Sequence, residues 1–214
     1  MNDIIIYGAG GFGREIACML KIINKEIPQW KFLGFIDDGL EQDKQNKYGK
    51  VLGNIDFLNS YPKKAAVAIS ITSPAIRKKI VQRITNPDIW FPNLIAPNVN
   101  FYDQESLITG HGNIIFFGCR LSCEVKLGDF NILNGFVSLG HDVAVGSFNI
   151  FGPSVRISGN TQIGDLNFFG VQSIVLQRCK IGNNTRIGVS SVIMKNTKDD
   201  SLYFGNPAKI VKGL

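Results

Sequence analysis

The C-terminal half of the sequence repeats every six residues, and this repeat restricts the possible folds more than any other feature. From Ile115 to Ile193 the sixth residue is apolar in fourteen consecutive hexads, and glycine follows it in eight of them. A period of six is three times the strand period of two and does not fit an amphipathic helix. Short strands that stack their apolar residues inward produce such a pattern. We therefore predict a parallel β-helix of about four to five coils, three hexads per coil, with glycines supplying unusual backbone angles near the corners.

A second column of the repeat lies two residues before the apolar one. It is filled mostly by small or β-branched side chains, and asparagine takes most of the remaining places. We expect these asparagines to form a ladder or to satisfy the amides of turns, which is a structural role. They are Asn113, Asn131, Asn149 and Asn167.

The N-terminal half follows the order strand, glycine-rich turn, helix, strand. An apolar run at residues 4–7 precedes GAGGFG at 8–13, and helical periodicity follows over 14–23. A second apolar run at 32–36 ends in Asp37 and Asp38. This order is typical of a βαβ unit in which glycines let the backbone approach a phosphate at a helix N-terminus. We expect a nucleotide or nucleotide sugar at this turn. A dinucleotide site and a purely structural turn are the alternatives, because the unit is only about 90 residues long.

A third apolar run, over residues 66–71, extends the same unit. It leads to Thr72 and Ser73, and Ser73 has the features of an N-cap, with Pro74 at the first position of a helix that continues to residue 84.

Composition narrows the class of protein further. Hydrophobic residues make up 44% and charged residues 19% of the 214 residues, values typical of a globular protein. No apolar stretch is long enough to span a membrane, and the short apolar run after Met1 has no basic region before it, so no signal peptide is expected. The net charge of +6 is divided between a predicted helix and the tail, which argues against nucleic acid and membrane partners. The four scattered cysteines favour the cytoplasm, with Cys119 and Cys179 buried in the repeat.

Few groups in the sequence can carry out chemistry. The two histidines cannot supply a three-histidine zinc site, and we expect no metal. His111 precedes the regular repeat and is interpreted as a surface or entry-turn residue. His141 lies two residues after the inward Leu139, so its side chain points outward near a corner beside Asp142. It is either an incidental surface residue or a general base, since imidazole accepts protons near neutral pH.

Four motifs together resemble one known family. GAGGFG at residues 8–13, FIDD at 35–38, the His-Asp step at 141–142 and GNPAK at 205–209 are similar to the NeuD/PglD-like family of sugar O- and N-acetyltransferases. The resemblance covers essentially the whole chain. It implies an α/β Rossmann-like domain over residues 1–95, followed by an all-β left-handed parallel β-helix with a tail over residues 96–214. It also implies a homotrimer in which acetyl-CoA lies between neighbouring β-helices.

The resemblance assigns roles to individual residues. The catalytic base matches His141, and the acidic residue that increases its basicity matches Asp142. The residues matching the nucleotide-sugar site are Gly10, Gly11, Phe12, Asp37, Asp38, Thr72 and Asn134. The positions matching the acetyl-CoA site, which is formed largely by backbone amides, are Ile150, Gly159, Val171 and Val189. Many relatives carry a second histidine at the position of Ile150, so here either another donor polarises the thioester or backbone amides alone hold the acetyl group.

These observations predict an enzyme that moves acetyl from acetyl-CoA to an amino group of a UDP- or GDP-linked amino sugar. No serine or cysteine is paired with a base in the sequence pattern, which favours direct transfer over a covalent intermediate. Two alternatives remain open. One is O-acetylation of a sugar hydroxyl, as in sialic acid, and the other is a non-catalytic nucleotide-binding β-helix protein.

Overall fold

The structure, a computed structural model, describes residues 1–211. The chain divides into two compact units, with the boundary between Pro97 and Asn98. The sequence-based boundary lies two residues earlier. In residues 1–211, no helix is long and apolar enough to cross a membrane.

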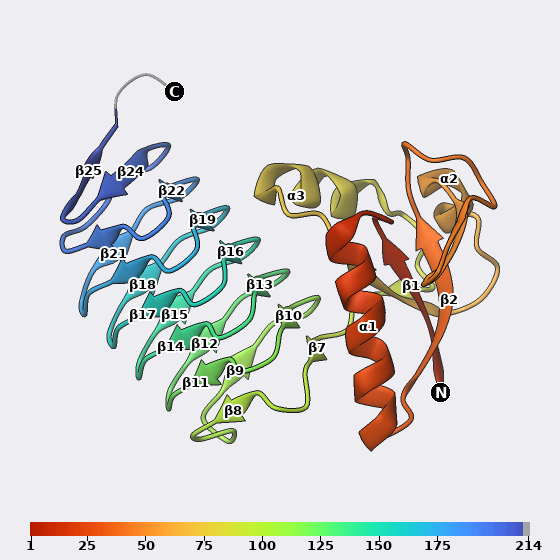
Figure 1. The fold of residues 1–214 in the computed structure, drawn as a ribbon, viewed down its shortest axis with the longest axis horizontal. Coiled ribbons are helices and arrows are strands. Elements are labelled where there is room, and N and C mark those ends of the chain that lie inside the picture. The colour runs from red at the N-terminus through yellow and green to blue at the C-terminus, as the bar shows by residue number, and fades with distance from the viewer. Residues whose placement is uncertain (212–214) are drawn as a thin grey trace. The chain divides into compact units, whose positions relative to one another are not determined.

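The N-terminal unit is built on a six-stranded sheet with the order β3-β4-β2-β1-β5-β6 (Figure 1). All neighbouring strands are parallel except the β3–β4 pair, which is antiparallel. Its strands are β1 (Asn2–Tyr7), β2 (Trp30–Ile36), β3 (Gln45–Asn46), β4 (Gly49–Gly53), β5 (Ala65–Ile69) and β6 (Ile89–Trp90). Its helices are α1 (Gly11–Glu26), α2 (Ile55–Asn59) and α3 (Pro74–Arg83). This is the expected Rossmann-like arrangement, in which β1, α1 and β2 form the first βαβ unit.

Helix α1 confirms the predicted apolar face. The side chains at Ile16, Met19, Leu20 and Ile23 are all buried, in the spacing that places them on one side of a helix. Helix α3 begins at Pro74 as expected. Ser73 occupies its N-cap position, also as expected, and its side chain makes no capping hydrogen bond.

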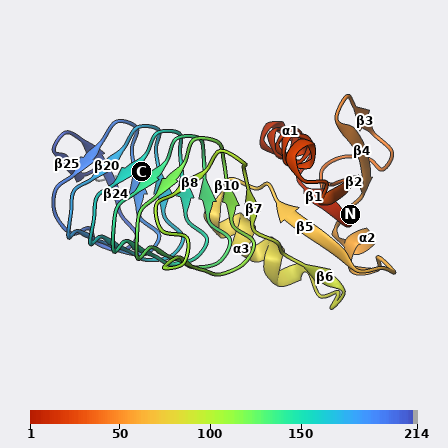
Figure 2. The same ribbon diagram turned by 90° about the horizontal axis from the view of Figure 1, so that it is seen from below.

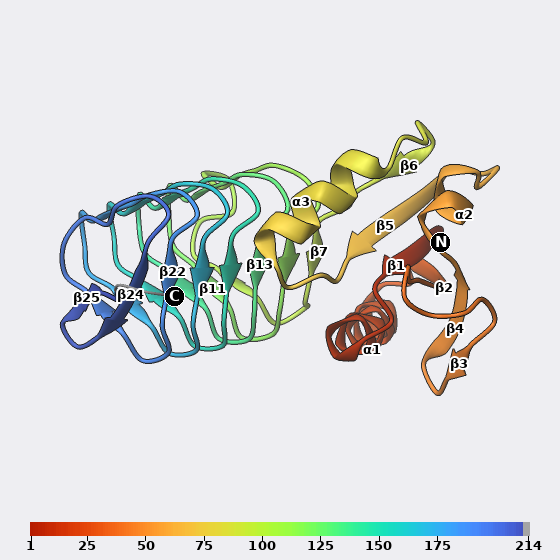
Figure 3. The ribbon, with the colours of Figure 1, turned by 90° about the horizontal axis from the view of Figure 1, so that it is seen from above.

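The second unit is a parallel β-helix whose two-residue strands stack into three sheets, which we call S1, S2 and S3 (Figures 2 and 3). S1 contains β10 (Ile114–Ile115), β13 (Ile132–Leu133), β16 (Ile150–Phe151), β19 (Phe168–Phe169), β22 (Arg186–Ile187), β24 (Leu202–Gly205) and β25 (Ala208–Ile210). S2 contains β8 (Asn100–Phe101), β11 (Arg120–Leu121), β14 (Ser138–Leu139), β17 (Arg156–Ile157), β20 (Ile174–Val175) and β23 (Val192–Ile193). S3 contains β9 (Ile108–Thr109), β12 (Lys126–Leu127), β15 (Ala144–Val145), β18 (Gln162–Ile163) and β21 (Lys180–Ile181). The short strand β7 (Leu94–Ile95) precedes them in the chain.

The apolar column of the repeat forms the interior of the β-helix. Each of its fourteen residues is at most 5% exposed. Equivalent residues pair in register 18 positions apart, as Leu121 does with Leu139 and Leu139 with Ile157. The rings of Phe151 and Phe169 stack inside, with centroids 4.5 Å apart and planes 10° apart. The six-residue period therefore corresponds to one side of a three-sided coil.

The repeat begins earlier than the sequence pattern indicated. Strands β8 and β9 precede Ile115 and pair in parallel with β11 and β12. Thr109 lies eight positions after Phe101, whereas equivalent positions on successive sides of the later coils are six apart. This local insertion hid the first coil from a search for strict hexads.

The inward asparagines form a ladder, as expected. The backbone N–H groups of Asn131, Asn149, Asn167 and Thr185 each donate to the side-chain oxygen of the asparagine 18 residues earlier, at 2.7–2.9 Å. All these residues are fully buried. The ladder therefore satisfies polar groups that would otherwise be costly to remove from water.

The predicted role of the repeat glycines is wrong. The left-handed backbone angles of the coils fall mostly on non-glycine residues. These residues lie two positions after the place in each hexad that glycine often fills, and Phe136 (φ 63°) and Asp142 (φ 57°) are examples. The glycines are needed for space instead. A Cβ on Gly170 would lie 2.6 Å from the backbone nitrogen of Val189 in the next coil, and one on Gly140 would lie 2.7 Å from that of Gly159. Successive coils therefore approach too closely for any side chain at these positions.

Candidate active site

The glycine-rich turn joins β1 to α1, and its glycines serve two purposes. Gly8 has φ 104°, which favours glycine, and a Cβ at Gly13 would collide with the carbonyl oxygen of Gly8. These two glycines therefore allow helix α1 to pack on the end of β1. Gly10 and Gly11 face open space, and the nearest atom to a Cβ on Gly11 would be Arg14 Nη2 at 3.8 Å. The open side of the turn is therefore where a ligand can approach the backbone.

The N-terminus of α1 suits an anion. Gly10 is the N-cap and offers no side chain to the first amides of the helix, and the first turn contains no acidic residue. Backbone amides at a helix N-terminus point toward a ligand, and the helix dipole favours negative charge at this point. Phe12, in the first turn, is half-buried. The predicted diphosphate site at Gly10, Gly11 and Phe12 thus has suitable electrostatics.

Asp37 and Asp38, at the end of β2, both have partners within the N-terminal unit. Asp37 accepts hydrogen bonds from the backbone N–H of Ala9 at 2.9 Å and of Gly39 at 3.0 Å. Asp38 accepts from the Tyr7 hydroxyl at 2.8 Å and lies 3.3 Å from Arg83 Nη1. Burial, followed by the hydrogen bond and charge of Asp38, raises the pKa of Tyr7. Asp37 therefore fixes the glycine turn, whereas Asp38 holds the end of β1, and its side chain remains 39% exposed.

Two further contacts hold this end of the sheet, and sequence reasoning missed both. The Ser70 hydroxyl donates to the carbonyl oxygens of Tyr7 at 2.7 Å and Gly8 at 3.0 Å, which anchors the glycine turn to the end of β5. Arg77 Nη1 donates to the carbonyl oxygen of Ile71 at 3.2 Å, next to the exposed Thr72. Burial lowers the pKa of Arg77 to about 9. A hydroxyl directly after the apolar run of β5 is the one signal that could have indicated Ser70.

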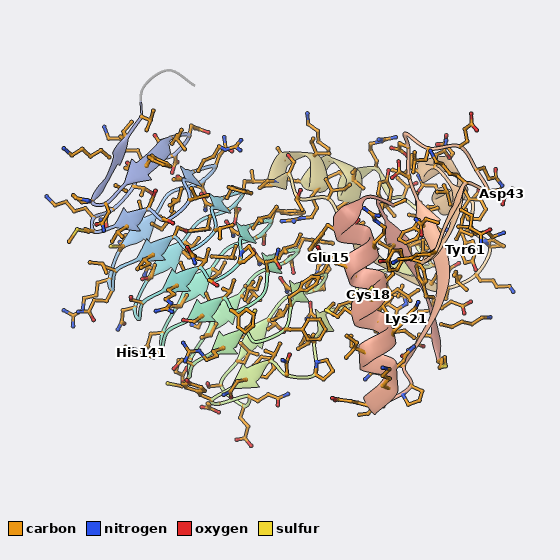
Figure 4. The ribbon with its side chains drawn as sticks, viewed as in Figure 1. Glu15, Cys18, Lys21, Asp43, Tyr61 and His141 are labelled. Carbon is orange, nitrogen blue, oxygen red and sulfur yellow. The ribbon has the colours of Figure 1, made fainter. Side chains whose placement is uncertain are left out.

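Three edges, where the coils turn from one sheet to the next, carry the remaining predicted residues. In the coil at residues 132–149, residues 134–136 form the S1–S2 edge, 140–142 the S2–S3 edge and 146–148 the S3–S1 edge. His141 and Asp142 lie on the S2–S3 edge. The side chain of His141 is on the outside of the β-helix (Figure 4). Asn134 lies on the S1–S2 edge of the same coil, where its side-chain oxygen accepts from the Gly135 amide at 2.8 Å.

His141 and Asp142 form a close pair. His141 Nδ1 lies 2.7 Å from Asp142 Oδ2, and the two side chains are 54% and 50% exposed. When Asp142 accepts a hydrogen bond from Nδ1–H, Nε2 is left as the acceptor nitrogen of a neutral imidazole. The backbone of Asp142 adopts the left-handed angles noted above, which bring its carboxylate beside the preceding residue. The pair therefore has the arrangement that a general base requires.

The three edges differ in how their backbone amides are satisfied. On the S3–S1 edge, one backbone N–H group of each coil donates a hydrogen bond of 2.7–3.0 Å to a side-chain oxygen of the following coil. The accepting residues are Asp129, Ser147, Asp165, Asn183 and Asp199. On the other two edges, the amides of Gly159, Val171 and Val189 have no acceptor among residues 1–211. These three amides are therefore free to bind a ligand.

The predicted acetyl-CoA residues do not form one cluster in a single chain. Gly159 lies on the S2–S3 edge, directly after His141 in the stack, whereas Val171 and Val189 lie on the S1–S2 edge with exposures of 43% and 55%. Ile150 begins β16 and is only 5% exposed. In the described part of the chain, no three histidine, cysteine or acidic side chains are grouped so that they could hold a metal ion.

The thiols differ in exposure, and this gives a direct test of the β-helix register. Cys119 and Cys179 are buried as expected, and burial raises the pKa of both thiols, that of Cys119 to about 11. Cys123 is exposed. Since the thiolate is the reactive form, a disulfide reagent at about pH 8 should modify Cys123 quickly and the two buried thiols only after unfolding. Peptide mapping of the labelled protein checks this, with Cys123→Ala as the control. Fast labelling of Cys119 would contradict the register.

The fold and these sites define a class of protein: a Rossmann-like unit with an open helix N-terminus, followed by a parallel β-helix that exposes a His-Asp pair on one edge. Residues 3–84 match the family model described as the PglD N-terminal domain. The N-terminal unit is therefore a PglD-type domain. No curated protein matches the chain by sequence.

Solved structures resemble the chain over nearly its whole length. The acetyltransferase domain of PglB from Neisseria gonorrhoeae FA1090, in complex with acetyl coenzyme A, is 25% identical with a TM-score of 0.86, and the match covers 98% of this chain and 99% of that one. WeeI from Acinetobacter baumannii AYE is 26% identical with a TM-score of 0.87 and coverages of 97% and 99%. A perosamine N-acetyltransferase variant from Caulobacter crescentus, in complex with CoA and GDP-perosamine, is 21% identical with a TM-score of 0.89 and coverages of 100% and 98%. The last match shows a shared fold.

Proposed function

We propose that this protein is an acetyl-CoA-dependent sugar acetyltransferase whose acceptor is the amino group of a nucleotide-linked amino sugar. The observation that carries the proposal is the His141–Asp142 pair, with its 2.7 Å contact on an exposed edge beside an unpaired backbone amide. The PglD-type N-terminal domain, with its open helix N-terminus, supports a nucleotide diphosphate as the part of the acceptor that is held. The similarity to an acetyltransferase domain in complex with acetyl coenzyme A supports the donor.

The proposed reaction is a direct transfer. The acceptor amine attacks the thioester carbonyl carbon while His141 Nε2 takes a proton from the amine. The tetrahedral intermediate carries its negative charge on the former carbonyl oxygen, which the free Gly159 amide is suited to stabilise. Collapse of the intermediate breaks the carbon–sulfur bond. The imidazolium then protonates the departing thiolate, so that CoA leaves as a thiol and His141 returns to its neutral form.

A trimer would bring the two predicted halves of the site together. Asn134 and His141 lie on different edges of one coil, and Val171 and Gly159 lie on these same two edges in later coils. In a closed ring of three copies, the S1–S2 edge of one copy can face the S2–S3 edge of the next, because such contacts are heterologous. We therefore propose a homotrimer in which Asn134, Val171 and Val189 act across the interface from the partner's His141. Four free cysteines support a reducing compartment, and the proposed location is the cytoplasm.

A ligand panel tests the proposal against its alternatives. The protein is mixed with UDP-, GDP- and CMP-linked sugars, with and without a free amino group, and its melting temperature and acetyl-CoA-dependent release of CoA thiol are measured. Stabilisation and thiol release with an amino sugar nucleotide support the proposal. Release with a sugar that offers only hydroxyls would indicate O-acetylation. Stabilisation without release from any sugar would indicate a nucleotide-binding protein without this activity.

A further inference from the structure

We infer that Gly159 is a positioning residue for His141: the absence of a side chain at Gly159 allows the imidazole to lie against the next coil while it contacts Asp142. The inference rests on the proposed function of His141 as the base. It gives Gly159 a role distinct from the coenzyme contact implied by family resemblance.

The geometry at this position is specific. His141 and Gly159 are 18 residues apart and occupy equivalent places in successive coils. A Cβ on Gly159 would lie 2.6 Å from His141 Cε1 and 2.8 Å from Cδ2, and closer still to Nε2. The Nε2 edge of the ring therefore fills the volume that a side chain at Gly159 would occupy. The opposite side of the ring is held by Asp142 through Nδ1.

Three other glycines of the coils are needed for a different reason. The space next to Gly140, Gly152 and Gly170 is limited by backbone atoms of the following coil. At Gly159 the three nearest atoms all belong to one imidazole ring, and its φ lies outside the left-handed region. An alanine at this position should thus leave the coil intact and displace only the ring of His141. The cost would appear in the position of the base and not in the fold.

The test is Gly159→Ala, studied with the full chain. We expect kcat for the amino sugar to fall by about 10²-fold, because small displacements of a reacting group have effects of that size. KM for acetyl-CoA should change by less than about twofold, which separates positioning from ground-state binding of the coenzyme.

Two controls accompany the variant. Gly110→Ala places a methyl group against Asp129 on the S3–S1 edge, and it should lower the melting temperature without changing KM or the pH profile. In the His141→Ala background, adding Gly159→Ala should have no further effect on the residual rate, because the ring that it displaces is gone. A further loss in that background would overturn the inference. So would a raised KM for acetyl-CoA with kcat unchanged.

A readout without turnover separates this inference from the proposed function. The protein has two histidines, so replacing His111 by glutamine assigns the imidazole signals of His141 in an NMR titration. Gly159→Ala should shift those signals even if no sugar is acetylated, because it displaces the ring. Unchanged signals would overturn the inference, whereas an inactive wild-type protein would overturn only the proposed function.

Discussion

Replacement of His141 by alanine is expected to lower kcat/KM for the amino sugar by about 10²- to 10⁴-fold, the range that general bases contribute. Without His141 to accept it, the proton of the attacking amine must be transferred to water. The melting temperature should change little, because the His141 side chain is 54% exposed and its polar partner Asp142 is on the surface. Steady-state thiol release and a thermal melt of the same preparation measure both quantities.

Two companion variants make the test specific. Asp142→Asn removes the carboxylate that contacts Nδ1 and should reduce the rate less than His141→Ala does. Cys123→Ala should leave the rate unchanged, although Cys123 is exposed and occupies the place equivalent to His141 in the preceding coil. A large loss in Cys123→Ala would indicate a covalent acetyl-thioester intermediate. Near-normal turnover in His141→Ala would remove the proposed base.

The second large effect is on stability. Phe151→Ala should lower the free energy of unfolding by about 3–5 kcal/mol, the usual cost of removing a buried aromatic ring. Phe151 is fully buried, and its ring stacks on that of Phe169 in the next coil at 4.5 Å. The variant loses the burial of the Phe151 ring and part of the packing of Phe169. The cavity should remain open, because the interior of a coil has little freedom to collapse into it. Urea unfolding of the two units, followed by fluorescence and circular dichroism, measures the change.

The matched control is Phe136→Ala. Phe136 is 69% exposed on the S1–S2 edge, so its loss should cost less than about 1 kcal/mol. Equal destabilisation by the two variants would mean that the interior column does not hold the coils together as described.

The repeat could be predicted well because its chemistry is local. One apolar residue in six is a strong pattern, and the inward asparagine column follows from the same register. The first coil was missed because the insertion between Phe101 and Thr109 breaks that spacing. The role of the glycines was mistaken because contacts between coils involve residues 18 or 19 apart, which a search within one hexad does not compare. The S3–S1 side-chain ladder escaped notice for the same reason, since its members are a mixture of Asp, Ser and Asn.

The N-terminal unit and the site show a similar division. The strand–glycine–helix order indicated β1, α1 and β2, whereas α2 and the β3–β4 hairpin have no strong periodicity that could reveal them. His141 and Asp142 were identified as neighbours in sequence, and they are neighbours in space. The seven-residue separation of Asn134 and His141 exceeds one side of a coil, so the two lie on different edges. The internal partners of Asp37 and Asp38 depend on long-range contacts that the sequence pattern does not contain.

The three-hexad coil also restricts how this sequence can change length. Inserting or deleting one hexad before residue 141 would turn every later residue by a third of a revolution, which would carry His141 from the S2–S3 edge to another edge. An insertion of 18 residues would restore the angular position and displace the pair by one coil along the axis. Length variation in this half of the molecule is therefore tolerable only in steps of a whole coil, because only these steps keep His141 and Asp142 on the same edge.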